Sequence, residues 1–348
     1  MQFIKISILI LSVLSTACQL RPVQTVEAQV LASDDFLTIQ SLTTTTVTPI
    51  AAQADTKILN DRLKQKKLAH PEKPIIALVL GSGGARGYAH IGVIEVLEQQ
   101  GIKPDFIVGT SAGSIVGSIY ASGKTAKQLT EIALGMKATD VREFKIGLKG
   151  IFDGRKVEDY VNKQVGEQTL EQLQIPMFVV ATELKNGEKV VFNSGNTGQA
   201  VRASVTIPSM FIPTLIDGKE YVDGGLVSPV PVNVARELGA DVVIAVDILA
   251  QPMYTETKNV WGLFNQNINI MQNTLAEKEL KNADIVIQPD LREKAHIFDV
   301  TARQETIQAG IDVTQQKIKL IKNVLERIEA QKMLEVNAVN QLDSSTNE

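Results

Sequence analysis

The 348-residue sequence is poor in several residue types whose chemistry defines large classes of functional site. It contains a single cysteine, Cys18, which excludes a disulfide within the chain and a metal site built from several cysteines. It has only three histidines, His70, His90 and His296, so candidates for a histidine general base are few. Aromatic residues make up 5% of the chain, the formal net charge is −4, and no dense basic stripe interleaved with aromatics occurs. We therefore exclude nucleic acid as a partner.

The N-terminus lacks a long hydrophobic run, because its apolar stretch covers only residues 6–14 and is too short to span a bilayer as a stable helix. Preceded by a lysine, this stretch predicts a signal peptide over residues 1–17. The small residues Thr16 and Ala17 in front of Cys18 resemble a bacterial lipobox, whose cysteine is lipidated after cleavage. The next residue is not the aspartate linked to inner-membrane retention, so the resemblance favours a lipid anchor in the outer membrane of the cell envelope. Secretion without a lipid is the alternative.

The rest of the composition is that of a globular protein, with 44% hydrophobic and 21% charged residues. Residues 18–70 are polar, rich in threonine and nearly free of aromatics, which predicts a lipid-anchored tether without a core. Residues 71–335 carry the apolar patterns and are expected to form one domain that ends in a long helix. Residues 336–348 are predicted to be a flexible tail.

Short apolar segments and helical patterns alternate along the predicted domain. The segments expected to be strands are IIALVL, DFIVG, PMFVVAT, KVVFN, DVVIAVD and ADIVIQP. Helices are expected near residues 85–100, 156–165, 197–205, 231–239, 260–280 and 302–335. Strands that alternate with helices indicate an α/β fold with a mostly parallel central sheet flanked by helices.

The stretch GTSAG, residues 109–113, follows the apolar strand DFIV and precedes the helical segment AGSIVGSIY. A strand, a sharp turn and a helix form the context in which a nucleophile elbow exposes a serine at the carboxyl edge of a sheet. Gly109 and Gly113 would let the backbone pack tightly, and the helix N-terminus would favour developing negative charge beside Ser111. The alternative is that Ser111 only caps the helix.

A second glycine-rich stretch, GSGGARG at residues 81–87, also lies between a strand and a helix, so its N–H groups should face the same sheet edge as Ser111. A dinucleotide fingerprint would need glycine where Arg86 stands, and the SGKT at residues 122–125 follows a helix, unlike a phosphate-binding loop. We therefore predict no nucleotide cofactor. The remaining function is an oxyanion hole, formed by Gly83, Gly84, Ala85 and Arg86. Three roles stay open for the Arg86 side chain: fixing the loop through backbone carbonyls, contacting a lipid phosphate, or providing a plain surface charge.

A nucleophilic serine needs a general base, and the histidines are poorly placed to supply one. His70 lies in the tether, and His90 is interpreted as a packing residue on the helix after the glycine loop. His296 would give the chain order serine, acid, histidine of an α/β-hydrolase triad. In that fold several strands precede the nucleophile, whereas here only one strong strand precedes Ser111.

A carboxylate can serve as the base if burial raises its pKa and it reaches the serine hydroxyl directly. The best candidate is Asp223 in KEYVDGGLVSPVPV, where Gly224 and Gly225 would hold it on a tight turn. Asp153 and Asp217 also precede a glycine, as turn aspartates often do. For Asp217 the turn role is favoured, because LIDGKEYV is typical of a β-hairpin.

Three motifs in order resemble the patatin-like phospholipases, a family related to the catalytic domain of neuropathy target esterase: GSGGARG followed by YAHIGV, then GTSAG, then DGG. The resemblance covers about residues 75–320. It implies the three-layer fold of that family, with Ser111 as nucleophile, Asp223 as the base of a Ser-Asp dyad, the first glycine loop as oxyanion hole, and no metal or cofactor. Ser82 replaces a glycine of the family motif, and Ser228 stands where asparagine is frequent.

The sequence thus predicts a serine acyl hydrolase of the phospholipase A, lysophospholipase or esterase type, acting on lipid esters through an acyl-enzyme. The expected partners are a phospholipid or other lipid ester and the membrane that holds the anchor at Cys18. Two alternatives stay open. One is a non-catalytic lipoprotein that binds lipid or scaffolds the envelope, and the other is a Ser-His-Asp esterase that uses His296.

Overall fold

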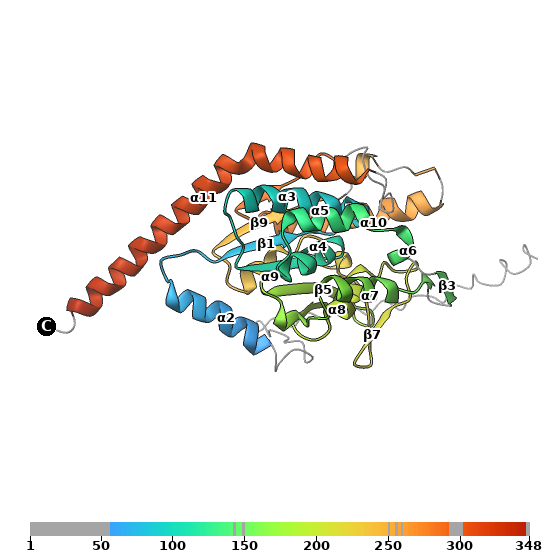
Figure 1. The fold of residues 1–348 in the computed structure, drawn as a ribbon, viewed down its shortest axis with the longest axis horizontal. Coiled ribbons are helices and arrows are strands. Elements are labelled where there is room, and N and C mark those ends of the chain that lie inside the picture. Colours follow the sequence, from blue (N-terminus) through green and yellow to red (C-terminus); the bar gives the residue numbers. More distant parts are fainter. Residues whose placement is uncertain are drawn as a thin grey trace, which may run out of the picture. The chain divides into compact units, whose positions relative to one another are not determined.

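The computed structural model describes residues 56–141, 144–147, 150–249, 251–254, 257–258, 260–291 and 302–345 (Figure 1). The predicted signal peptide, the predicted lipidation site Cys18 and the candidate base His296 lie outside these described residues. All described residues belong to one compact unit.

An eight-stranded sheet forms the centre of this unit, in the order β10-β9-β1-β2-β5-β8-β7, with β6 also paired to β5. Its strands are β1 (Ile76–Leu80), β2 (Phe106–Thr110), β5 (Met177–Glu183), β6 (Lys189–Phe192), β7 (Thr214–Ile216), β8 (Lys219–Asp223), β9 (Val242–Val246) and β10 (Ile285–Ile287). Strands β1, β2, β5, β9 and β10 are parallel, whereas β6 and β8 run antiparallel to β5. The mostly parallel α/β sheet predicted from the sequence is therefore confirmed. Strands β3 (Phe144–Gly147) and β4 (Gly150–Phe152) form a separate hairpin.

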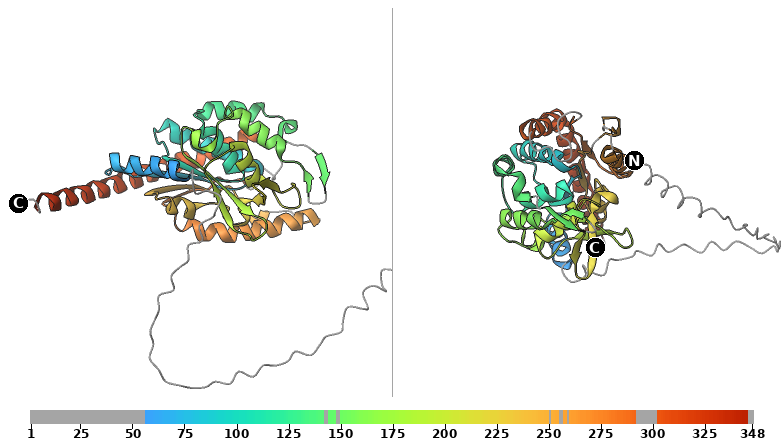
Figure 2. Two further views of the ribbon diagram at one scale, coloured as in Figure 1. Left: turned by 90° about the horizontal axis from the view of Figure 1, so that it is seen from below. Right: turned by 90° about the vertical axis from the view of Figure 1, so that its right-hand side faces the viewer.

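Side chains of the buried strands alternate between two apolar cores, one on each face of the sheet. In β1, Leu78 and Leu80 pack into one core, whereas Ala77 and Val79 pack into the other. The first core is completed by α3, α4, α5, α7, α8 and α11, and the second by α2, α9 and α10. Figure 2 shows the resulting three layers, with the sheet between α10 and the helices drawn in green. The predicted three-layer arrangement is thus present.

The helix positions follow the sequence patterns closely. The α-helices are α2 (Thr56–Ala69), α3 (Tyr88–Gln99), α4 (Ala112–Ala121), α5 (Ala126–Gly135), α6 (Ala138–Val141), α7 (Arg155–Gln164), α8 (Thr197–Val205), α9 (Val232–Glu237), α10 (Val260–Leu280) and α11 (Arg303–Ser345). Two short 3₁₀ turns contain parts of glycine motifs: η2 (Gly84–Gly87) belongs to GSGGARG, and η4 (Gly224–Leu226) belongs to the DGG turn.

Two predicted boundaries are wrong. Helix α2 lies where the tether was expected, yet its Leu63 is buried, and Arg62 donates to the backbone oxygens of Leu173, at 3.2 Å, and Gln174, at 2.9 Å. Together with an ion pair between Lys66 and Asp105, these contacts attach the polar segment to the domain. Helix α11 continues to Ser345, into the predicted flexible tail, because neither glycine nor proline occurs in it after Gly310.

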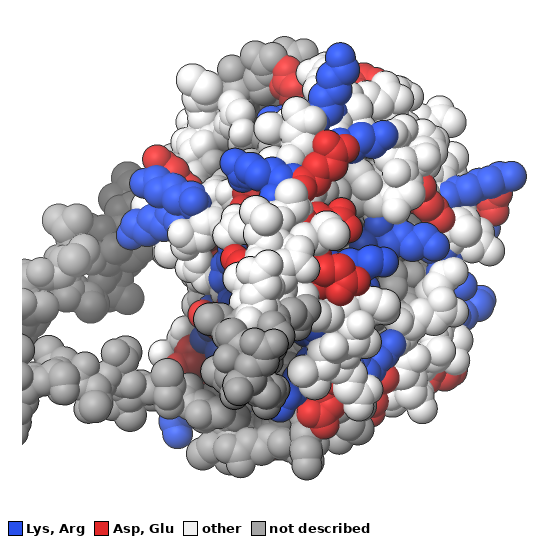
Figure 3. All heavy atoms as spheres, turned by 90° about the vertical axis from the view of Figure 1, so that its left-hand side faces the viewer, with Lys and Arg blue, Asp and Glu red and all other residues white. Residues whose placement is uncertain are grey.

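Charged side chains of both signs are interspersed over the described residues of the face drawn in Figure 3. This distribution agrees with the near balance of 35 Lys and Arg against 39 Asp and Glu in the sequence. Such a mixed face produces little long-range attraction for a partner of one charge.

Candidate active site

The ends of β2 and β8 meet on one edge of β5. Thr110, the last residue of β2, pairs with Val180, and Asp223, the last residue of β8, pairs with the next residue, Ala181. Strand β6 pairs with β5 over the same stretch and so takes its other edge. Because a strand has only two edges, β2 and β8 must share the remaining one and approach each other end to end. This register brings the residue after Thr110 next to Asp223.

That residue is Ser111, and its Oγ donates a hydrogen bond of 2.7 Å to Oδ2 of Asp223. Both residues are buried, with 5% of their surface exposed. Ser111 has φ 53° and ψ −117°, a strained conformation that costs about 1–3 kcal/mol and marks a nucleophile elbow. Its side chain makes no capping bond to α4, so the alternative of a simple helix cap is wrong.

The two glycines of GTSAG are required by close packing around this turn. A Cβ on Gly109 would lie 2.7 Å from the backbone oxygen of Gly113. A Cβ on Gly113 would collide with the backbone oxygen of Leu80 in β1. The elbow is therefore pressed directly against the neighbouring strand, and a side chain at either position would displace Ser111.

Side chains from neighbouring elements hold the elbow in place. The Ser111 N–H donates to Ser204 Oγ at 2.8 Å, and Ser204 Oγ donates to the backbone oxygen of Val180 at 2.6 Å. Ser114 Oγ donates to the Ser111 carbonyl at 2.6 Å. The amide of the nucleophile is thus already used, and oxyanion donors have to come from elsewhere.

Asp223 is fixed on a turn whose glycines are also needed. Its Oδ1 accepts the Gly225 N–H at 2.7 Å, and its backbone oxygen accepts Thr182 Oγ1 at 2.9 Å. A Cβ on Gly224 would collide with the backbone oxygen of Val180. Burial raises the pKa of Asp223 from 3.8 to about 6, although the hydrogen bonds from Ser111 and Gly225 oppose this shift.

The other two candidate aspartates have different surroundings. Asp217 is exposed in the turn between β7 and β8, with φ 50°, as the hairpin pattern predicted. Asp153 is buried, and its carboxylate forms ion pairs with Arg155 at 2.8 Å and Arg202 at 3.4 Å. Ser111 and Asp223 are 112 residues apart in the sequence, and the pairing of strands in the sheet brings them together.

The loop GSGGARG lies beside the elbow, where Gly84, Ala85 and Ser111 line the same cavity. Within the part of the chain that the structure describes, no acceptor takes the N–H of Gly83, Gly84 or Ala85, so these groups can serve as donors. The Arg86 N–H donates to the Gly83 carbonyl at 3.2 Å. Including the Arg86 amide in the predicted oxyanion hole was therefore wrong, because the 3₁₀ turn uses it.

The Arg86 side chain is buried, and its Nε donates to the backbone oxygen of Ile248 at 2.9 Å. Burial lowers its pKa to about 10, whereas the charge of Asp247 opposes this shift. Of the three roles left open by the sequence, the surface charge is wrong. The bond to a backbone carbonyl favours a role in fixing the glycine loop.

The two described histidines do not contact the dyad. His90 is fully buried, with Nε2 2.9 Å from the Gly81 oxygen, and burial lowers its pKa to about 4. It is therefore neutral at physiological pH and braces the start of the glycine loop. His70 is exposed at the end of α2, where its Nδ1 lies 3.4 Å from Glu72.

One buried carboxylate near the site was missed in the sequence. Glu279 of α10 accepts Ser228 Oγ at 2.6 Å and the Asn233 N–H at 3.1 Å. The Ser228 carbonyl in turn accepts Thr110 Oγ1 at 2.9 Å, next to the nucleophile. Burial raises the pKa of Glu279. Its sequence neighbours in EKEL are mostly charged, so the sequence pattern did not predict that Glu279 is buried.

The cavity at Ser111 has a volume of about 210 Å³ and is almost entirely apolar. Its lining comes mainly from α4, α5 and α7, with Tyr88, Ile91, Val205, Ile207 and Phe211 closing it from other elements. Sequence patterns did not reveal this cavity, because apolar positions that line a cavity look the same as apolar positions that fill a core.

Neither a metal cluster nor a membrane span was found in the part of the chain that the structure describes. Among the described residues, no three His, Cys, Asp or Glu side chains lie close enough together to hold a metal ion. None of the described helices combines the length and the apolar character that crossing a membrane requires.

Comparison with known proteins shows a similarity to one family. Residues 78–236 match the family model of patatin-like phospholipases. An uncharacterized NTE family protein of Mycobacterium tuberculosis is 40% identical over 181 residues, which cover 50% of this chain and 49% of that protein. Human patatin-like phospholipase domain-containing protein 6 is 33% identical over 208 residues, covering 56% of this chain and 15% of that protein.

Among solved structures, VipD from Legionella pneumophila has 15% sequence identity and a TM-score of 0.47, covering 70% of this chain and 66% of that one. The chain spans about half the length of the mycobacterial relative and a smaller share of the human one. The family match includes the glycine loop, the serine elbow and the DGG turn. The similarity of this chain to the patatin-like phospholipase family therefore extends over residues 78–236.

Proposed function

We propose that this protein is a serine acyl hydrolase that cleaves carboxylic esters of lipids with a dyad of Ser111 and Asp223. The observation that carries the proposal is the 2.7 Å hydrogen bond from the Ser111 hydroxyl to a buried carboxylate whose pKa is raised to about 6. Such a carboxylate is largely ionised at neutral pH and is a better proton acceptor than an exposed aspartate. The match of residues 78–236 to the family model of patatin-like phospholipases supports the same chemistry.

In the acylation step, Ser111 Oγ attacks the ester carbonyl carbon while its proton moves to Asp223 Oδ2. The carbonyl oxygen becomes negatively charged, and the N–H groups of Gly83, Gly84 and Ala85 are the candidate donors that stabilise it. When the tetrahedral intermediate collapses, the bond to the alcohol breaks and Asp223 returns the proton to the leaving oxygen. The acyl group remains on Ser111 as an ester.

Deacylation repeats these steps with water as the nucleophile. Asp223 takes a proton from the water, the hydroxide oxygen attacks the acyl carbon, and the proton returns to Ser111 as the carboxylic acid leaves. Neither step requires a histidine.

The apolar cavity at Ser111 supports a lipid substrate, since it offers almost no polar partner for a polar acyl group. The human relative is named as a phospholipase domain-containing protein, and a phospholipid is accordingly our first candidate substrate. Lipid anchoring at Cys18 would place the enzyme at the envelope membrane that supplies such a substrate. A phospholipase A or lysophospholipase activity is therefore proposed in addition to simple ester hydrolysis.

The test measures hydrolysis of a 4-nitrophenyl ester by the purified protein and its variants. Ser111→Ala and Asp223→Asn should each lower kcat/KM by about 10³-fold or more, whereas Asp217→Asn should leave it near the wild-type value. Mass spectrometry after incubation with mixed phospholipids should reveal released fatty acid and lysophospholipid. If Asp223→Asn stays active and His296→Ala is inactive, the triad replaces the dyad. Lipid binding without hydrolysis in the wild type would favour the non-catalytic alternative.

A further inference from the structure

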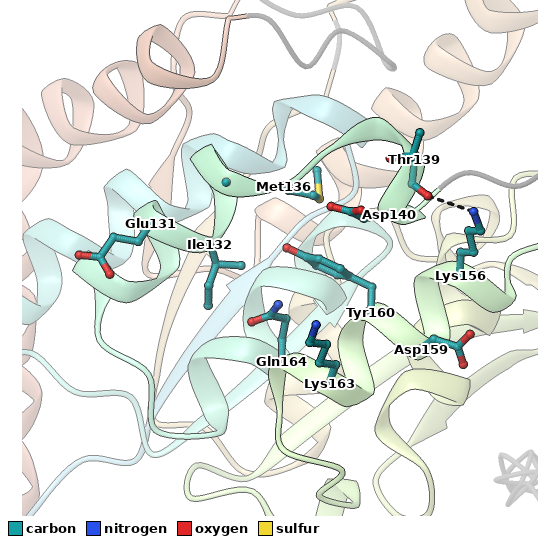
Figure 4. A pocket seen from close by; sticks show the side chains of 11 residues that line it. Glu131, Ile132, Met136, Thr139, Asp140, Lys156, Asp159, Tyr160, Lys163 and Gln164 are labelled. Atoms are coloured by element: carbon teal, nitrogen blue, oxygen red, sulfur yellow. Dashed lines mark hydrogen bonds between the residues drawn. The ribbon is translucent and has the colours of Figure 1, made fainter.

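The apolar cavity at Ser111 has a polar neighbour. A more open hollow of about 550 Å³ lies among α5, α6 and α7 (Figure 4). Seven of its eleven lining residues are polar or charged: Glu131, Thr139, Asp140, Lys156, Asp159, Lys163 and Gln164. Three residues line both spaces: Ile132, Met136 and Tyr160. These three are called the partition below.

We propose that the partition of Ile132, Met136 and Tyr160 closes the acyl cavity and thereby sets the length of the acyl chain that Ser111 accepts. The inference rests on the proposed acyl-hydrolase function and adds the determinant of chain length to it. The partition separates an apolar space that contains the nucleophile from a more open hollow, lined by charged residues, that does not contain it.

The shape of the cavity follows from one face of α4. Four residues on this face line the cavity: Ala112, Ile115, Val116 and Ile119. The cavity therefore extends about 10 Å along the helix from the position next to Ser111. Helices α5 and α7 contribute the lining opposite this face, with Leu129, Ile132 and Ala133 from α5 and Val157, Tyr160 and Val161 from α7. An acyl chain on Ser111 therefore lies between these three helices, and the partition closes the seam between α5 and α7.

The Tyr160 side chain is suited to a boundary between an apolar and a polar space. Figure 4 shows its ring extending from α7 toward Ile132 and Met136 at the end of α5. Burial raises the pKa of Tyr160 to about 12, and the nearby Tyr88 and Asp140 act in the same direction, against Arg303. The hydroxyl therefore stays protonated, so that the ring can face lipid while the hydroxyl contacts the polar side.

The volume of the cavity limits the chain to a medium length. An apolar protein cavity of about 150 Å³ holds benzene with its six carbons, so the 210 Å³ available here corresponds to about eight carbons. A chain of about sixteen carbons would need about twice that volume by the same ratio. Carbons that passed into the polar hollow would remain in contact with water and would contribute little binding free energy. Because the partition also blocks the path of these carbons, we expect kcat/KM to be highest near eight carbons and to fall for longer chains.

The experiment measures kcat/KM for 4-nitrophenyl esters of 4, 8, 12 and 16 carbons with the purified full chain. Tyr160→Ala removes the ring, and Met136→Ala shortens a half-buried side chain at the end of α5, where folding is less at risk. Either change frees the volume that the removed side chain occupied at the end of the acyl cavity. About two more methylene groups of a 12-carbon chain can then be buried, so the kcat/KM ratio of the 12-carbon to the 8-carbon ester should rise about tenfold. Tyr160→Phe keeps the ring and should retain the wild-type ratio.

Lys163→Ala is the matched control. Lys163 is exposed one turn further along α7 and lines only the polar hollow, so this change should leave the chain-length profile unaltered. The inference is overturned if the wild type hydrolyses 8-carbon and 16-carbon esters equally well. It is also overturned if both alanine variants hydrolyse the 4-carbon ester with an unchanged 12-to-8 ratio, and in both cases the proposed function survives. A wild type that hydrolyses none of the esters overturns the proposed function together with this inference.

Discussion

Replacing Asp223 by asparagine should make the protein more stable at neutral pH, although it removes the proposed general base. In the folded protein, burial raises the pKa of this carboxyl from 3.8 to about 6, while the hydrogen bonds from Ser111 and Gly225 only partly oppose the shift. In the unfolded chain the carboxyl is exposed and returns to its ordinary pKa. Ionised Asp223 therefore destabilises the folded state, and a neutral amide of nearly the same size does not.

The magnitude follows from the difference between the two pKa values. Below pH 3.8 the carboxyl is mostly protonated in both states, and above about pH 6 it is mostly ionised in both. Since the folded pKa is the higher one, stability decreases as the pH rises through this window. A difference of about 2 units at about 1.4 kcal/mol per unit gives a penalty of about 3 kcal/mol. Wild type should therefore lose about 2–3 kcal/mol relative to Asp223→Asn between pH 4 and pH 8, with most of the loss below pH 6.

Urea unfolding of both proteins at pH 4, 5, 6, 7 and 8 provides the measurement. Taking the difference between the two free energies of unfolding cancels the contributions of the other ionisable groups. The change of this difference with pH is then free of any constant effect of the amide. Asp217→Asn is the control, because it makes the same chemical change at an exposed turn and should give a flat difference. A difference between wild type and Asp223→Asn that stays constant from pH 4 to pH 8 would refute the reasoning.

Three further predictions concern the base, the elbow and the anchor. The kcat/KM of the wild type on a soluble ester should fall tenfold per pH unit below about pH 6, as Asp223 becomes protonated; a flat profile down to pH 4 would contradict its role as base. Gly113→Ala should destabilise the protein by about 3 kcal/mol or more, because the new Cβ meets the neighbouring strand. Gly101→Ala should cost only about 1 kcal/mol, because the space around its Cβ is open and only its φ of 71° is unfavourable. Thermal or urea unfolding of the two variants compares these costs. Cys18→Ser should abolish incorporation of labelled palmitate and release the protein from membranes, while activity on a soluble ester persists; a wild type that takes up no label and fractionates as soluble would end the lipoprotein proposal.

Local patterns in the sequence determined the sheet strands, most helices and the two glycine motifs. The serine elbow could be predicted because a strand, a tight turn and a helix follow each other without interruption around Ser111, and the turn geometry depends on its own glycines. The hairpin turn at Asp217 could be predicted for the same reason. In each case the residues that decide the conformation lie within a few positions of one another.

The tertiary structure decided which aspartate faces the serine. Asp153, Asp217 and Asp223 each precede a glycine, and only the sharing of one edge of β5 by β2 and β8 places Asp223 at 2.7 Å from Ser111 Oγ. The burial of Arg86 against Ile248 and the apolar cavity depend in the same way on elements far apart in the chain. A short stretch of sequence cannot determine these features, because they depend on burial between packed layers. The raised pKa of Asp223, for example, is caused mainly by its burial.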